Sequence, residues 1–99
     1  MSYEVVFPSE RIEREFEKTL RKIPSDDRNA LLQAIRSLSS HPKPAGKNVK
    51  KLKGHVAIFH LIAQYRLRVG PYRILHDVNE KMKQVVLLKL LKRDERTYQ

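Results

Sequence analysis

The chain has 99 residues, no cysteine and only three glycines. Without cysteine it can form neither disulfide bonds nor thiolate zinc sites. Because its histidines show no spacing typical of metal ligands, we expect no metal site and no cofactor; they are His41, His55, His60 and His76. With 40% hydrophobic residues the composition differs from that of a disordered basic tail, and it predicts one folded domain over residues 1–99.

Long apolar segments are also missing from the sequence. No stretch approaches the roughly 20 apolar residues that span a bilayer. The first eight residues have neither the basic start nor the apolar centre of a secretory signal. We therefore expect an intracellular, cytoplasmic protein without membrane contact.

Acidic residues are absent from the middle of the chain. Residues 28–76 contain ten lysines and arginines and no aspartate or glutamate, within a chain of formal net charge +10. A continuous basic segment of this kind is typical of surfaces that bind polyanions. Nucleic acid is the first ligand to consider.

Hydrophobic periodicity predicts an α+β fold in the order β-α-α-β-β-β. A short β-prone segment at residues 3–7 precedes a helix that Ser9 caps, and residues 24–27 separate this helix from a second one. Strands are predicted over residues 56–69, 72–78 and 84–91. We expect an antiparallel sheet with the helical pair packed on one face. The apolar stripes of the helices are Ile12, Phe16, Leu20 and Ile23, then Leu31, Ala34, Ile35 and Leu38.

A hairpin at residues 65–75 carries the most specific charge pattern. Gly70 and Pro71 suit a two-residue type II′ turn, which pairs Arg68 directly with Arg73. Alternation then places Arg66 on the same exposed face as these two arginines, with the apolar residues on the other. Opposed like charges are destabilising unless an anion lies between them. The face is interpreted either as a phosphate-binding site or as an ordinary solvated surface.

Further basic residues flank the hairpin. Lys50, Lys51 and Lys53 are interpreted either as a second phosphate-contacting strip or as a basic loop that approaches the sheet. The C-terminal segment adds cations, including Lys92, and the ring of Tyr98, which can stack on an unpaired base. Taken alone, such a segment also fits a frayed terminus.

Three segments together resemble the RelE/ParE superfamily of type II toxin–antitoxin toxins, in particular its RelE branch. They are Lys-Lys-Leu-Lys-Gly at 50–54, Tyr-Arg-Leu-Arg-Val-Gly-Pro-Tyr-Arg-Ile-Leu at 65–75, and the end of the chain at 89–98. The resemblance implies a fold similar to that of small microbial ribonucleases and metal-independent cleavage of mRNA in the ribosomal A site. It also implies an acidic antitoxin as partner.

The same resemblance implies a role for each matching residue. Arg66 and Arg68 would lie near the attacking 2′-hydroxyl, and Arg73 would hold the scissile phosphate. Arg93 would stabilise the leaving group or the transition state, and Tyr98 would orient the base. The 2′-oxygen would attack the adjacent phosphate, giving a cyclic phosphate and a free 5′-hydroxyl.

The proton acceptor for this reaction is not evident in the sequence. Arginine is a poor general base because its pKa lies above 12. Histidine is the side chain type that titrates near neutrality, but alternation sends His76 to the face opposite Arg73, which favours a packed histidine. Residues 56–62 also form an unusually long apolar link, interpreted either as an extension of the strand or as a contact for a partner chain.

Two other functions remain open at this stage. The ParE branch of the superfamily inhibits DNA gyrase without cleaving RNA, and a shared fold does not fix the activity. A domain that binds RNA or an antitoxin without catalysis is the third alternative, because the general base is missing.

Overall fold

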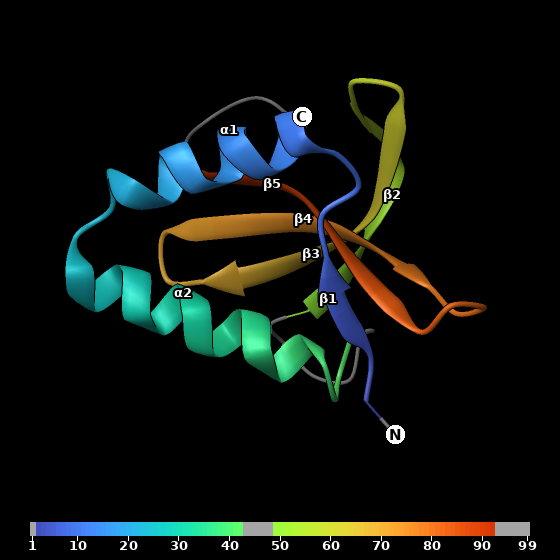
Figure 1. The fold of residues 1–99 in the computed structure, drawn as a ribbon, viewed down its shortest axis with the longest axis horizontal. Helices are drawn as coiled ribbons and strands as arrows, with labels where there is room; N and C mark the ends of the chain where they lie inside the picture. Colours follow the sequence, from blue (N-terminus) through green and yellow to red (C-terminus); the bar gives the residue numbers. More distant parts are fainter. Residues whose placement is uncertain (1, 43–48, 93–99) are drawn as a thin grey trace.

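The computed structural model describes residues 2–42 and 49–92, except for the side chains of residues 53–55. The elements, in order, are β1 (Glu4–Val6), α1 (Glu10–Arg21), α2 (Ser25–Leu38), β2 (Val49–Ile58), β3 (Leu61–Val69), β4 (Tyr72–Asn79) and β5 (Gln84–Lys92) (Figure 1). The predicted α+β class is confirmed. Among the described helices, none is long and apolar enough to cross a membrane.

The sheet has five described strands in the order β1-β5-β4-β3-β2. Its strands pair antiparallel except for β1, which runs parallel to β5 with Val5 opposite Val85. The sheet is therefore mixed, whereas the sequence predicted a wholly antiparallel one. Short turns dictate antiparallel pairing between consecutive strands, but nearly the whole chain separates β1 from β5, so no turn constrains their direction.

The prediction of one strand over residues 56–69 is wrong. The chain turns at Phe59 and His60, where Ile58 pairs with Leu61, and two strands replace the single one. Phe59 adopts a φ of 58°, a left-handed conformation that glycine or asparagine usually supplies in such turns. The sequence therefore contained no turn signal. β2 extends back to Val49 and includes Lys50 and Lys51, for which a basic loop was one of two interpretations.

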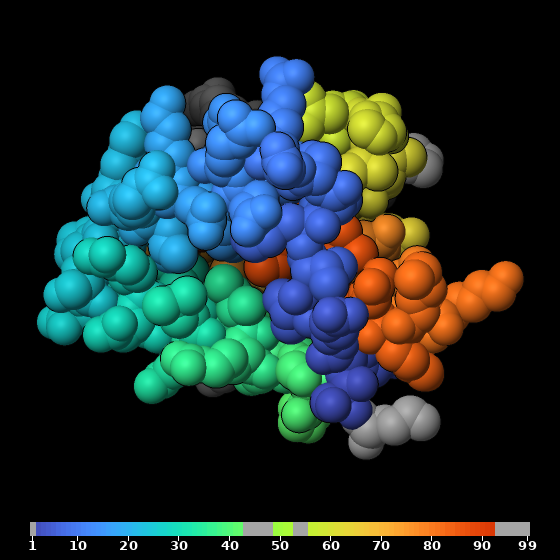
Figure 2. All heavy atoms as spheres, in the orientation of Figure 1, coloured from blue at the N-terminus to red at the C-terminus, as the bar shows by residue number. Residues whose placement is uncertain are grey.

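Both helices cover one face of the sheet, as predicted. Figure 2 shows their side chains over most of this side of the molecule, with only a little of the sheet visible between them. Ser9 begins α1 as expected, because its Oγ accepts a hydrogen bond from the backbone N–H of Ile12 at 3.2 Å. The larger core cluster joins the helices to the sheet through Phe16, Ile23, Leu31, Leu38, Leu67, Tyr72, Ile74, Val85, Leu87 and Leu90.

A second, smaller core cluster lies where the β2–β3 turn meets β4, β5 and the beginning of α1. Its buried members are Ile12, Val56, Ile58, Ala63, Leu75, Leu88 and Leu91. Residues 56–62 are therefore only partly available to another chain. Phe59 and Ile62 remain exposed, by 52% and 46%.

Candidate nucleic-acid interface

The hairpin formed by β3 and β4 has the predicted register. Val69 pairs with Tyr72, Arg68 with Arg73, and Arg66 with Leu75. Gly70 has a φ of 56°, which it adopts without the steric cost that a Cβ would bring. Because directly paired residues share a face, Arg66, Arg68 and Arg73 lie on the same side of the sheet.

These three arginines, which we call the arginine face, differ strongly in burial. Arg68 is exposed and Arg66 is half-buried, with an Nε that has no hydrogen-bond partner among the described residues. Arg73 is only 5% exposed, so the expectation that all three are exposed is wrong for this residue. Its Nη1 donates hydrogen bonds to the carbonyl oxygens of Tyr72 at 2.8 Å and Gly70 at 3.0 Å. Arg73 thus braces the turn that positions it.

The lysines predicted to form a strip at residues 50–53 do not all lie on the same side of the sheet. Lys50 pairs with Arg66 and therefore belongs to the side of the arginine face. Lys51 pairs with Tyr65 and points to the opposite side. The alternative of a basic loop is wrong, because both residues belong to β2; the side chain of Lys53 lies outside the described residues.

The end of β5 also departs from the expected arrangement. Lys92 pairs with Tyr72, which places it on the side opposite Arg73. Lys89, which the sequence reasoning missed, pairs with Leu75 and so joins the row that contains Arg66. Only the register could reveal this, because a bulge between Leu75 and His76 interrupts the alternation along β5. Arg93 and Tyr98 lie outside the described residues, so their roles remain predictions.

His76 is fully buried on the side opposite the arginine face, as alternation predicted. Its ring stacks on Tyr65, with ring centroids 5.7 Å apart, and its Nε2 lies 3.1 Å from the carbonyl oxygen of Pro42. Burial lowers the pKa of His76, against the opposing effects of backbone carbonyl groups and of Asp77. This packing favours the structural role over the catalytic one.

The lowered pKa of His76 makes stability depend on pH. In the unfolded chain His76 binds a proton with a pKa near 6.5, whereas the folded chain resists this protonation. The contribution of neutral His76 to stability is therefore complete above about pH 6.5 and is lost as the pH falls below that value. We expect the unfolding free energy to fall by up to about 1.4 kcal/mol per pH unit in this window. Urea unfolding between pH 7.5 and 5 measures this slope.

His76→Phe is the control, because it keeps an aromatic ring against Tyr65 but does not titrate. The unfolding free energy of this variant should change less with pH than that of the unsubstituted chain. The nearby charged residues Lys51 and Asp77 are the same in both proteins, so the difference between the slopes reports on His76. Equal slopes would show that other groups cause the dependence.

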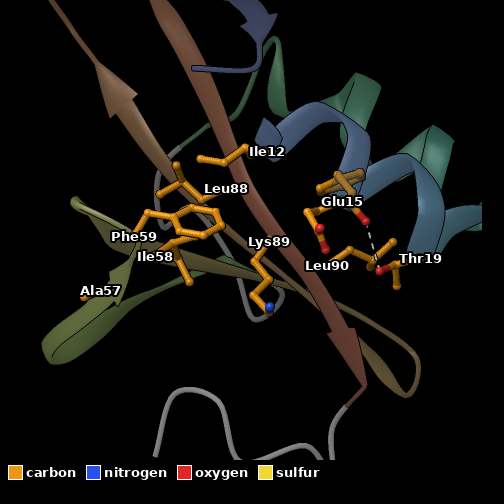
Figure 3. Close-up of a pocket in the computed structure, with 10 residues that line it drawn as sticks. Ile12, Glu15, Thr19, Ala57, Ile58, Phe59, Leu88, Lys89 and Leu90 are labelled. Atoms are coloured by element: carbon orange, nitrogen blue, oxygen red, sulfur yellow. Dashed lines mark hydrogen bonds between the residues drawn. The ribbon is translucent and has the colours of Figure 1, made fainter. Parts of the chain in front are cut away.

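A cavity of about 170 Å³ lies outside the arginine face, between α1, β5 and the β2–β3 turn. Figure 3 shows Ile12, Glu15 and Thr19 of α1 on one side and Phe59 with Ile58 on the other. The guanidinium of Arg11 lies 4.2 Å from the centre of the Phe59 ring, a cation–π contact that holds the turn against α1. Most of the residues that line the cavity are apolar, but Glu15, Thr19 and Lys89 also contribute to its wall.

Within the described residues, no group of three or more histidine or acidic side chains is arranged to hold a metal ion. The arginine face itself supplies fixed positive charges. Guanidinium groups match phosphate oxygens in two-pronged geometry and stay charged at every biological pH.

Comparison with protein families matches residues 9–97 to the family described as ParE toxin of type II toxin-antitoxin system, parDE. The chain belongs to the RelE/ParE family of type II toxins. The toxin–antitoxin resemblance seen in the sequence is thereby confirmed. A search of curated proteins gives no match.

Solved structures of RelE-type proteins share the fold. The archaeal RelE–RelB complex from Pyrococcus horikoshii OT3 has 31% identity and a TM-score of 0.71, covering 96% of this chain and 99% of that chain. The toxin–antitoxin complex RelBE2 from Mycobacterium tuberculosis has 23% identity and a TM-score of 0.68, with 94% and 100% coverage. A mutant of the E. coli toxin RelE in the free state has 22% identity and a TM-score of 0.56, with 95% and 86% coverage.

Proposed function

We propose that this RelE/ParE toxin is a metal-independent endoribonuclease that cleaves mRNA in the ribosomal A site and thereby inhibits translation. The observation that carries the proposal is the arginine face, to which Lys50 is added by direct pairing with Arg66. No acidic residue occurs in residues 28–76, so the segment supplies no carboxylate to neutralise these charges. A phosphate group is the ligand that best relieves their repulsion.

The proposed mechanism assigns different tasks to the cations. Arg73, fixed by the turn carbonyls, holds the scissile phosphate, and exposed Arg68 stabilises the charge that develops on its oxygens. Arg66 and Lys50, both cationic, position the attacking ribose, and water takes up the 2′-hydroxyl proton. Arg93 and Tyr98 stabilise the leaving group and orient the base. Attack of the 2′-oxygen breaks the bond to the 5′-oxygen, which takes up a proton.

An acidic antitoxin is the proposed protein partner. The RelE structures from P. horikoshii and M. tuberculosis are both complexes with antitoxins. In this chain β2 lies at the edge of the sheet, and Phe59 and Ile62 are exposed beside it. An added strand or helix could bury these residues, while its carboxylates cover the basic surface.

Mapping of new 5′ ends on mRNA tests the nuclease proposal. In a cell-free translation reaction, the toxin should produce 5′-hydroxyl ends at discrete positions, and omission of ribosomes should reduce their number strongly. If the toxin inhibits translation in this reaction but the mRNA stays intact, the proposal is wrong.

Inhibition of DNA gyrase is the second candidate function, and the match to the ParE toxin family favours it. The same preparation can be added to a gyrase supercoiling reaction. Loss of supercoiling together with intact mRNA would replace the nuclease assignment by this one.

A further inference from the structure

A second cavity, of about 290 Å³, lies where the end of α1 meets the ends of β4 and β5 that adjoin the arginine face. Its walls are formed by Thr19, Lys22, Ile23, Pro24, Tyr72, Leu91 and Lys92. The predicted site residues do not explain it, since only Lys92 belongs to them. We propose that this cavity binds a nucleobase of the RNA next to the phosphate held on the arginine face; the inference rests on the proposed nuclease function.

The composition of the walls fits a nucleotide better than a simple anion. Ile23 and Pro24 give an apolar surface against which the flat face of a base can pack, and fully buried Leu91, which pairs with Arg73, closes the cavity behind them. Lys22, the residue that follows the end of α1, and Lys92 of β5 both line the cavity, and both side chains are exposed. An ammonium group can donate to a base carbonyl or to the phosphate attached to the same nucleoside.

The position of the cavity follows from the alternation of β4. Tyr72 lines the cavity, and the next residue, Arg73, belongs to the arginine face. Because consecutive side chains of a strand point to opposite sides, the two sites lie on opposite sides of the beginning of β4. Arg73 also donates a hydrogen bond to the carbonyl oxygen of Tyr72. The hydroxyl of Tyr72 lies 3.5 Å from an Oδ2 of Asp27, which anchors the wall to α2. An RNA strand that crosses the end of this hairpin therefore meets both sites in succession.

Binding of the four nucleoside 5′-monophosphates to the purified chain tests the inference without requiring cleavage. In methyl NMR spectra, the signal of Ile23 should shift during the titration, while those of Ile58 and Leu88 in the other cavity should not. Inorganic phosphate at the same concentration should leave the Ile23 signal unchanged, whereas Leu91, which pairs with Arg73, reports on the arginine face. An equal shift of Ile23 with phosphate, or no shift of Ile23 with any nucleotide, would overturn the inference.

Lys22→Ala and Lys18→Ala form a matched pair of variants. Both remove one exposed positive charge from the end of α1, but only Lys22 lines the cavity. We expect nucleotide affinity to fall about 5-fold to 10-fold in Lys22→Ala and to stay unchanged in Lys18→Ala. Equal losses would show a general charge effect and overturn the inference.

The two proposals can fail separately. If the chain does not cleave RNA but nucleotides shift Ile23, the cavity is a nucleotide site and the nuclease assignment is wrong. If the chain cleaves RNA and Lys22→Ala changes neither nucleotide binding nor the base preference beside the cleaved bond, the cavity inference is wrong.

Discussion

Arg68→Ala should lower RNA cleavage about 100-fold and leave the fold intact. The loss is expected because removal of one group that stabilises transition-state charge typically costs 100-fold to 1,000-fold in rate. Arg68 is exposed and paired directly with Arg73, so its truncation removes a like-charge repulsion and should raise the unfolding free energy by a few tenths of a kcal/mol. Single-turnover cleavage and thermal unfolding of the same preparation measure the two effects.

Lys51→Ala is the matched control for this experiment. Lys51 is also an exposed cation on a strand of the same sheet, but its pairing with Tyr65 places it on the opposite side. It should retain nearly full cleavage activity. If both variants lose the same activity, the overall charge matters and the arginine face has no specific role.

The sequence predicted the hairpin accurately because several local signals agreed there. The Gly70-Pro71 turn, the alternation on both sides and the placement of the arginines all require the same register, and the structure has that register. The helices could also be predicted, because signals such as the apolar stripe of α1 and the cap at Ser9 are local features of the sequence. The arginine face could thus be assembled from the sequence alone.

Other features depended on contacts that no local pattern encodes. Phe59 adopts a left-handed backbone conformation at a turn position where glycine is usual. Its ring contacts Arg11, which belongs to α1 and is distant in the sequence. The burial of Arg73 could not be predicted, because alternation gives the side of a strand but not what covers it. The cavity proposed to bind a nucleobase could not be predicted either. Its wall contains both Lys22 and Lys92, which are distant in the sequence.

The burial of Arg73 changes what its truncation should do. Arg73→Ala should abolish cleavage, and it should also lower the unfolding free energy by about 1–3 kcal/mol, because the carbonyl groups of Gly70 and Tyr72 lose hydrogen bonds from a charged donor. Arg73→Lys keeps the charge but not the planar fork, so it should retain RNA binding better than the alanine variant while cleaving poorly. Urea unfolding, RNA binding and single-turnover cleavage, measured below the melting temperature of each variant, separate these effects.

Gly70→Ala distinguishes catalysis from support of the turn. The substitution places an L-residue at a φ of 56°, which costs about 1 kcal/mol, although an added Cβ meets no atom within 4 Å. It therefore weakens the same turn as Arg73→Ala while it leaves the guanidinium in place. We expect similar destabilisation with most of the cleavage activity retained. If Gly70→Ala loses as much activity as Arg73→Ala, then Arg73 acts only by holding the hairpin together, and the phosphate-binding role is wrong.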